Sequence, residues 1–208
     1  MNRAMLGLMG ESGPGHLQSP DQESADAMNG PKGHIQACEA PHAAAPRSLG
    51  VSLIDRTGRF GRERSAWLIR EAGMAARAAG VQRGELRVAL VGDEEMAAAH
   101  LRHCGEPGTT DVITFDLADG SGDELDADLL VCLDEAERQA GVRGIRVEHE
   151  VLLYVVHGVM HCLGYDDHDE ASAGAMHAAE DRVLSRIGVG PVYGMAEASG
   201  RPSDERAG

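Results

Sequence analysis

The stretch between Arg146 and Leu163 constrains this chain of 208 residues more than any other part of the sequence. It is strongly apolar and is predicted to form one helix, yet it carries His157 and His161 four positions apart. Residues four apart lie one turn apart on the same helix face, so the two rings point the same way. Burying two imidazoles without a shared partner costs on the order of several kcal/mol. The fold therefore has to supply that partner.

The residues that follow this helix indicate that the partner is a metal ion. Gly164 can end the helix and let the chain turn back, which brings Asp167 or His168 to the same point. Two helical histidines and one further ligand leave a coordination position open for water, which is the layout of a catalytic zinc site. The alternative is that the two histidines are ordinary residues of the core, each with its own hydrogen-bond partner.

The remaining pattern of apolar residues predicts an α+β fold, because strands and helices occur without strict alternation. We expect a small mixed β-sheet of about four strands packed with about five helices, one of which carries the metal-binding histidines. The predicted strands are 50–55, 85–91, 111–117 and 127–133, with an acidic turn at 119–126. The predicted helices are 59–79, 93–103, 134–140, 146–163 and 170–187. The expected core stripe of the first helix is Phe60, Trp67, Leu68 and Met74.

Composition divides the chain into three regions. Residues 1–47 contain six glycines and five prolines without a helical or strand period, which predicts a disordered N-terminal extension. A folded domain is expected over 48–190 and a flexible C-terminal tail over 191–208. The four cysteines are far apart, and neither a secretory signal nor a membrane span is recognisable. We therefore expect a cytoplasmic protein with reduced thiols and no membrane partner.

The charge is acidic overall but unevenly distributed. A net charge of −15 argues against broad, non-specific binding to nucleic acid, because phosphates require local cations. Residues 55–87 nevertheless contain eight arginines and only four acidic residues. This cluster is either a solvated helix face or an anion-binding strip on an otherwise acidic protein.

Two known motifs resemble the histidine segment. Metzincin metalloproteases have H-E-x-x-H-x-x-G-x-x-H, but Gly158 stands at the position of their general base Glu and cannot transfer a proton. The sequence HGVMHCLGYDDH is much more similar to H-G-x-x-H-x-x-G-Y-D-H, the signature of the YbeY family of metal-dependent endoribonucleases. Three further segments resemble that family in the right order, at 108–117 (GTTDVITFDL), 127–136 (ADLLVCLDEA) and 150–158 (EVLLYVVHG).

The resemblance implies that the domain at 48–190 is a zinc-dependent hydrolase with one Zn²⁺ ion that cleaves single-stranded RNA. It further implies a role in ribosomal RNA processing, including maturation of the 16S rRNA 3′ end, and in ribosome quality control. The implied partners are ribosomal RNA and the small ribosomal subunit. The expected metal ligands are His157, His161 and His168, with Asp167 as the alternative third ligand. His157 and His161 then also serve catalysis, through water that the metal activates.

Two positions depart from the family pattern. The family's third histidine follows G-Y-D directly, where this chain has Asp167 before His168. An arginine that the family carries before P-T-D-V aligns with Cys104, so another cation has to hold substrate phosphate. The candidates for substrate binding are Arg59, Arg62 and Arg102.

Several carboxylates are candidates for supporting roles. Glu150 is seven residues before His157 and shares its helix face, so it could act as a base or as a hydrogen-bond acceptor. The candidates for orienting ligand imidazoles through their ring N–H groups are Asp111, Asp128 and Asp166. For each of these carboxylates, the alternative is a helix cap or a surface charge.

Two functions of other classes stay open at this stage. One is a metallohydrolase of another class, such as a peptidase, with its base supplied from elsewhere. The other is a ribosome-binding module in which the metal is structural. The missing Glu at Gly158 argues against the first, and the open coordination position argues against the second.

Overall fold

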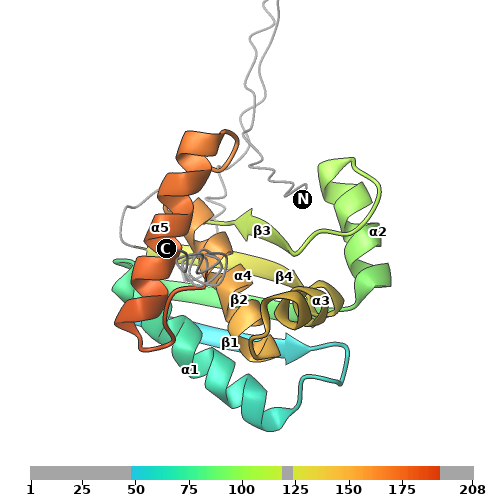
Figure 1. Cartoon of the computed structure of the whole chain (residues 1–208), viewed down its shortest axis with the longest axis horizontal. Helices are drawn as coiled ribbons and strands as arrows, with labels where there is room; N and C mark the ends of the chain where they lie inside the picture. The colour runs from blue at the N-terminus through green and yellow to red at the C-terminus, as the bar shows by residue number, and fades with distance from the viewer. Residues whose placement is uncertain (1–47, 119–123, 193–208) are drawn as a thin grey trace, which may run out of the picture. The chain divides into compact units, whose positions relative to one another are not determined.

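The computed structural model describes residues 48–118 and 124–192. This part of the chain folds into four strands and five helices (Figure 1). Their order is β1 (Leu49–Asp55), α1 (Arg62–Ala78), β2 (Arg83–Val91), α2 (Asp93–Cys104), β3 (Val112–Asp116), β4 (Glu124–Cys132), α3 (Leu133–Arg143), α4 (Val147–Cys162) and α5 (Glu170–Arg186). The predicted extension at 1–47 and most of the predicted tail at 191–208 lie outside the described residues. The proposed domain limits therefore stay a prediction.

The strands form one sheet in the order β1-β2-β4-β3. β1, β2 and β4 are parallel, whereas β3 runs antiparallel to β4 at the edge of the sheet. The chain passes from β1 to β2 through α1, because parallel neighbours need a long crossover connection. The sheet is therefore mixed, and the predicted α+β class with four strands and five helices is confirmed for the described part of the chain.

The strand β4 begins earlier than the sequence predicts. The acidic stretch 119–126 is expected to be a turn, but Glu124 and Asp126 already belong to β4. They face solvent on one side of the sheet, where they pair with Arg83 and Arg87 of β2, while Leu125 between them is buried. A strand with one solvated face accepts such alternation of charged and apolar residues. The rest of the predicted turn, 119–123, lies outside the described residues.

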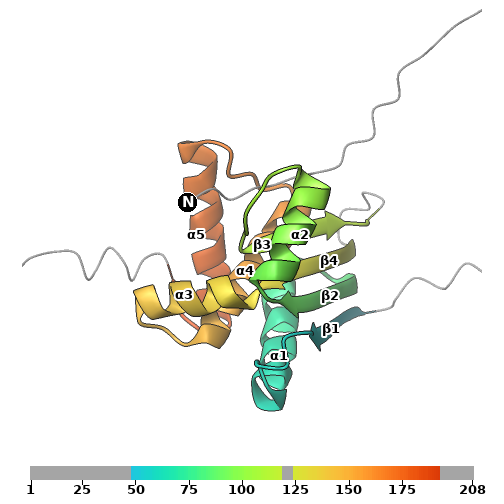
Figure 2. The same cartoon turned by 90° about the vertical axis from the view of Figure 1, so that its right-hand side faces the viewer.

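The helix α4 is the centre of the core, which explains its strongly apolar sequence. Every residue from 151 to 160 is buried, because α4 packs against the sheet on one side and against α1 and α5 on the other. Figure 2 shows the strands on one side of the molecule and α1, α4 and α5 on the other. A smaller apolar cluster joins α2 to the opposite face of the sheet, through Val91, Met96, Ile113 and Cys132.

The helix α1 packs differently from the predicted stripe. Leu68 and the preceding Phe60 are buried as expected, and Trp67 is half-buried, but Met74 is 42% exposed. Small residues make the contact with α4 instead, namely Ala72, Ala75 and Ala76. Their size lets the two helices approach closely, which turns Met74 outward.

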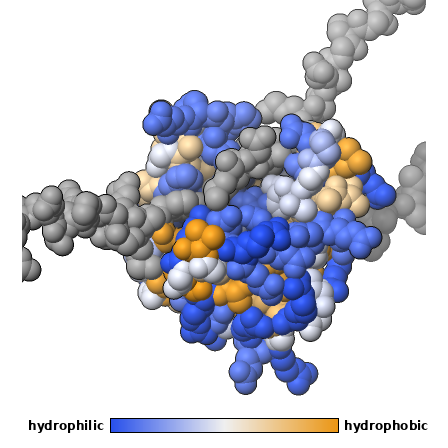
Figure 3. Space-filling view, turned by 45° about the vertical axis from the view of Figure 1, so that its right-hand side comes forward, coloured by the Kyte–Doolittle hydropathy of each residue, from blue (hydrophilic) through white to orange (hydrophobic). Residues whose placement is uncertain are grey.

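The solvent-facing side of these elements is mostly polar. Figure 3 shows one face of the molecule on which hydrophilic residues dominate and hydrophobic residues form small, separate groups. In the described part of the chain, none of the helices combines the length and the hydrophobicity that crossing a membrane requires.

Candidate metal centre

The C-terminal end of α4 positions the candidate ligands. The helix stops at Cys162, and Gly164 follows with φ of 86°, in the left-handed region that glycine adopts without strain. The N–H of Gly164 donates to the carbonyl of His161, and the N–H of Tyr165 donates to the carbonyl of Met160. This pair of bonds is a Schellman motif, which reverses the chain at the helix end. The predicted turn after the histidine helix is thus present.

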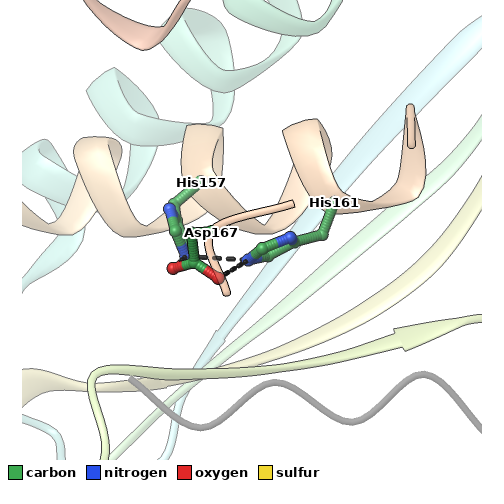
Figure 4. Close-up of side chains that lie close together, drawn as sticks. All are labelled: His157, His161 and Asp167. Carbon is green, nitrogen blue, oxygen red and sulfur yellow. Dashed lines mark hydrogen bonds and ion pairs between the residues drawn. The ribbon is translucent and has the colours of Figure 1, made fainter. Parts of the chain in front are cut away.

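This turn brings Asp167 back to the two histidines of α4, so that three donor groups converge. Figure 4 shows His157 and His161 projecting from the same side of α4 toward β3, with Asp167 between them. The two Nε2 atoms are 2.9 Å apart, and the Asp167 carboxylate oxygens lie 3.7 Å from Nε2 of His157 and 4.0 Å from Nε2 of His161. The three side chains are 3%, 6% and 9% exposed. They form a shielded group, but one that solvent can still reach.

Each histidine is held from behind by its other ring nitrogen. Nδ1 of His157 hydrogen-bonds Oε1 of Glu180 at 2.6 Å, and Nδ1 of His161 hydrogen-bonds the carbonyl of Tyr165 at 3.0 Å. A carbonyl only accepts, so Nδ1 of His161 carries the proton, and a carboxylate at 2.6 Å requires the same of His157. In the neutral rings both Nε2 atoms then present lone pairs to each other. Burial, and next the neighbouring His157 ring, lower the pKa of His161, which favours its neutral form.

These observations fit a divalent metal ion. Two lone pairs facing each other at 2.9 Å repel unless a cation lies between them. Ligand atoms at zinc distances in a tetrahedron are about 3.3–3.6 Å apart, and the three separations bracket that range. The Oε2 atom of Glu180 is buried without a hydrogen-bond partner among the described residues, and this side chain lies directly behind His157. A cation at the Nε2 atoms would balance a carboxylate in this position. The donor set therefore suits a metal with imidazole and carboxylate ligands.

The side chain that lies beside the two histidines is that of Asp167 and not that of His168. His168 is exposed, and its Nδ1 hydrogen-bonds Asp166. That contact raises the pKa of His168. His168, Asp166 and Asp167 form a second, more exposed group of donors within 4.8 Å of one another. The structure thus brings the alternative ligand Asp167, and not His168, to the histidine pair.

At Gly158, α4 packs tightly against the sheet. A Cβ atom at this position would lie 2.8 Å from Cδ2 of Leu129 in β4 and 2.8 Å from Oγ1 of Thr114 in β3. Side-chain atoms essentially never approach so closely, so the packing of Leu129 and Thr114 against α4 requires glycine here. A peptidase glutamate has no room at this position.

Comparisons with known proteins address the same region. The family model described as "Endoribonuclease YbeY" matches residues 61–188, which include both histidines, Asp167 and Glu180. The chain belongs to the YbeY family. A relative named Endoribonuclease YbeY from Carboxydothermus hydrogenoformans is 33% identical over 106 residues, which cover 51% of this chain and 74% of the relative. A relative of the same name from Bacillus licheniformis is 30% identical, over 68% of this chain and 97% of the relative. Another from Moorella thermoacetica is 33% identical, over 55% of this chain and 81% of the relative.

The predicted base Glu150 lies apart from the converging donors of this YbeY-family site. It is fully buried, forms an ion pair with Arg143 of α3 and hydrogen-bonds the Tyr154 hydroxyl. Seven residues along a helix correspond to about 10.5 Å, so Glu150 stands two turns away from His157. Its contacts are those of an anchor between α3 and α4, and its role as a base stays a prediction.

Among the candidate carboxylates, the structure gives each predicted residue a local role. Asp111 accepts hydrogen bonds from the N–H of Val112 and the hydroxyl of Thr110, and Asp128 pairs with Arg87 on the solvated face of the sheet. Asp166 accepts a hydrogen bond from the N–H of Asp167 and so helps to shape the loop that carries this residue.

The residue that orients His157 is Glu180, which sequence reasoning missed. The sequence feature that could have revealed Glu180 is its position in the apolar stripe of the last helix, between Met176 and Val183, where a surface charge is not expected.

The candidate arginines do not gather at the metal centre. Arg59 forms ion pairs with Asp134 and Glu137 of α3. Arg62 is exposed at the start of α1, and Arg102 is exposed in the last turn of α2. Cys104, which aligns with the family arginine, ends α2, and burial raises the pKa of its thiol. Phosphate binding by these arginines stays a prediction, and none of them has a contact with the three converging donors among the described residues.

Proposed function

We propose that this chain is a metal-dependent endoribonuclease that hydrolyses single-stranded RNA. The observation that carries the proposal is the convergence of two imidazole Nε2 atoms and one carboxylate in a YbeY-family chain. The relatives' printed name, endoribonuclease, supports RNA as the substrate class. We further propose Zn²⁺ as the ion, ribosomal RNA of the small subunit as the substrate, including the 16S rRNA 3′ end, and the cytoplasm as the location.

In this proposal, some residues bind the metal ion and others orient those ligands. His157, His161 and Asp167 hold the ion, which when bound supplies a Lewis acid and lowers the pKa of a bound water. Glu180 and the carbonyl of Tyr165 fix the ring orientations and keep the protons on Nδ1. Three protein ligands leave a position for water or a phosphate oxygen. Asp167 contributes a negative charge that a third histidine would not.

The peptidase alternative is disfavoured by Gly158. A metalloprotease of the related pattern needs a glutamate there, and Leu129 and Thr114 fill the space that its side chain would require. A binding module with a structural metal is disfavoured by the open coordination position, since structural zinc sites have four protein ligands.

The decisive experiment compares the unaltered protein with His161→Ala, purified identically, on a labelled single-stranded RNA. Each protein is assayed with and without a chelator, and on a duplex and a peptide substrate. We expect only the metal-loaded, unaltered protein to cut, and only the single-stranded RNA. Equal cleavage by both proteins would reveal a contaminating nuclease. Peptide cleavage without RNA cleavage would establish the peptidase alternative.

A second experiment tests the finer parts of the proposal. Elemental analysis of the purified protein should find about one zinc ion per chain, and a different metal would correct that assignment. Incubation with precursor small-subunit particles should shorten the 16S rRNA at its 3′ end. If ligand variants lose sedimentation with the small subunit but have no cleavage to lose, the binding-module function replaces the enzymatic one.

A further inference from the structure

The proposed function leaves one requirement unmet, namely the groups that hold the RNA backbone beside the metal. Arg59 is engaged by two carboxylates of α3, and the residues around the three donors are acidic. In nucleic-acid complexes, phosphate oxygens are bound by arginine side chains and also by peptide N–H groups. Unpaired backbone close to the metal centre can therefore supply substrate contacts.

The strand β3 offers such backbone groups because, among the described strands, it pairs on one side only. β4 is its neighbour, and β3 ends the strand order. The N–H of Leu117 donates to the backbone carbonyl of Asp126, and the N–H of Cys132 donates to that of Asp111. The odd-numbered residues of β3 therefore exchange hydrogen bonds with β4. The even-numbered residues therefore direct their N–H and C=O groups away from β4.

Two of the outward N–H groups are without a partner in the part of the chain that the structure describes. The N–H of Val112 donates to the carboxylate of Asp111, but the N–H groups of Thr114 and Asp116 have no acceptor among the described residues. Alternate residues of a strand are about 6.7 Å apart, so the edge presents donors at a regular interval along an extended chain. The carbonyl groups of the same residues point outward as acceptors.

This edge runs past the metal centre. Thr114 lies against Gly158, the residue that directly follows His157 in α4, and a Cβ there would be 2.8 Å from the threonine hydroxyl. Figure 4 shows both rings on the side of α4 that faces β3. The free edge and the metal-binding donors therefore border the same space.

We propose that the outer edge of β3 binds the backbone of single-stranded RNA, with the N–H groups of Thr114 and Asp116 donating to phosphate oxygens or to base acceptors. The outward carbonyl groups accept hydrogen bonds from ribose 2′-hydroxyls, which only RNA carries. The inference rests on the proposed endoribonuclease function and deepens it. It also accounts for strand selectivity, because the sugar-phosphate chain must lie extended along β3 and a duplex cannot unstack to do so.

Hydrogen exchange of individual amides tests the proposal on the unaltered, metal-loaded chain. The ligand is a short single-stranded RNA with phosphorothioate linkages, which slow its cleavage. We expect saturating RNA to slow exchange at Thr114 and Asp116 by about tenfold. Ile113 and Phe115, which already pair with β4, are the internal controls and should change little. A DNA of the same sequence should protect the two amides less than RNA does.

A pair of variants isolates one N–H group. Asp116→Pro removes the outward N–H and leaves the β3–β4 bonds in place, since proline is tolerated at edge positions whose N–H faces solvent. Asp116→Ala keeps the N–H and is the matched control for the lost carboxylate. We expect Asp116→Pro to bind the RNA about tenfold more weakly than Asp116→Ala, measured by fluorescence anisotropy, with similar melting temperatures.

The outcomes separate this inference from the proposed function. RNA binding without protection of Thr114 and Asp116 overturns the edge-strand inference and leaves the endoribonuclease function standing. Protection by an extended peptide but not by RNA overturns both. If Asp116→Pro fails to fold, the exchange measurement on the unaltered chain decides alone.

Discussion

Each histidine of the metal centre has two ring nitrogens with different tasks. Nε2 faces the other converging donors, and Nδ1 hydrogen-bonds an acceptor, which is a buried carboxylate for His157 and a backbone carbonyl for His161. The acceptors come from different parts of the chain, α5 and the turn after α4. A ligand pair anchored in this way loses little rotamer freedom on binding a metal, because the rings are already oriented.

The assignment of the third ligand makes the first prediction. Asp167→Ala removes the carboxylate that faces both Nε2 atoms, whereas His168→Ala removes a side chain that is exposed. We expect the loss of Asp167 to weaken metal binding by at least about 100-fold, since the loss of supporting residues alone costs 10–100-fold. His168→Ala should bind metal like the unaltered chain. Competition with a coloured chelator measures both, and the reverse order of affinities would assign the site to His168.

The second prediction concerns Glu180, whose carboxylate lies behind His157. Glu180→Gln keeps the size of the side chain but replaces its charge, and it weakens the acceptor of the Nδ1 proton. We expect metal affinity to fall by about 10–100-fold with little change in the fold. The matched control is Glu170→Gln, an exposed glutamate of the same helix. Equal affinities for the two variants would show that Glu180 does not support the ligand.

At the scale of elements, the distance between α4 and the sheet depends on one missing side chain. Gly158→Ala places a Cβ 2.8 Å from side-chain atoms of Leu129 and Thr114, so these buried side chains or α4 itself have to shift. We expect a destabilisation of about 1–3 kcal/mol in urea unfolding, together with weaker metal binding. Gly174→Ala in α5 is the control, because nothing lies within 4 Å of its added methyl group. That variant should gain about 0.5–1 kcal/mol, and similar effects at both positions would refute the close-packing argument.

The contact between α1 and α4 makes a prediction about pH. Trp67, the single tryptophan of the chain, stacks on His149 with ring centroids 5.4 Å apart. Burial, and next the charge of Arg146, lower the pKa of His149 below its ordinary value of 6.5. The unfolded chain therefore takes up this proton first as the pH falls, so the stability due to neutral His149 is present above pH 6.5 and is lost below it.

Tryptophan fluorescence checks this prediction directly. Protonated imidazole quenches a stacked indole, so the emission of Trp67 should drop only below pH 6.5, in the folded protein. His149→Gln should remove this step and flatten the corresponding fall in unfolding free energy. A quenching midpoint above 6.5 would mean that the acidic neighbours, rather than burial, determine the charge of His149.

At the scale of the whole molecule, the sequence predicts the order of elements well because each is marked by local signals. The histidine helix is nearly continuous in apolar residues, and Gly164 marks its end. The prediction fails where tertiary packing decides. Met74 fits the predicted helical stripe, but three alanines of α1 face α4 instead and Met74 is exposed. The acidic start of β4 forms a strand because arginines of β2 lie beside it.

The metal centre is predicted in the same partial way. The spacing of His157 and His161 is local, so their convergence follows from the sequence. Choosing between Asp167 and His168 depends on how the turn folds back, which residue types cannot determine. Glu180 is 23 residues from His157, and its role depends on the packing of α5 against α4. Contacts across the fold, rather than along the chain, are what the sequence leaves open.

The last prediction follows from how the metal centre joins the two C-terminal helices. His157 and His161 belong to α4, Asp167 to the loop after it and Glu180 to α5, so an ion at this point would connect α4, this loop and α5. Without the ion, two imidazole lone pairs face each other, and a buried oxygen of Glu180 has no hydrogen-bond partner among the described residues. Because the site exists only in the folded chain, bound metal stabilises the native state by RT ln(1 + [M]/Kd), about 2.7 kcal/mol at 100 times Kd.

Thermal unfolding measures this coupling. We expect a chelator to lower the melting temperature by several degrees and added zinc to restore it, since about 1 kcal/mol shifts a domain of this size by about 2–4 °C. In Asp167→Ala the melting temperature should respond to zinc only at much higher concentrations. Glu170→Gln should follow the unaltered chain. A melting temperature that is independent of zinc, in a protein that demonstrably binds it, would mean that the ion is held by a surface group and not by the three converging donors.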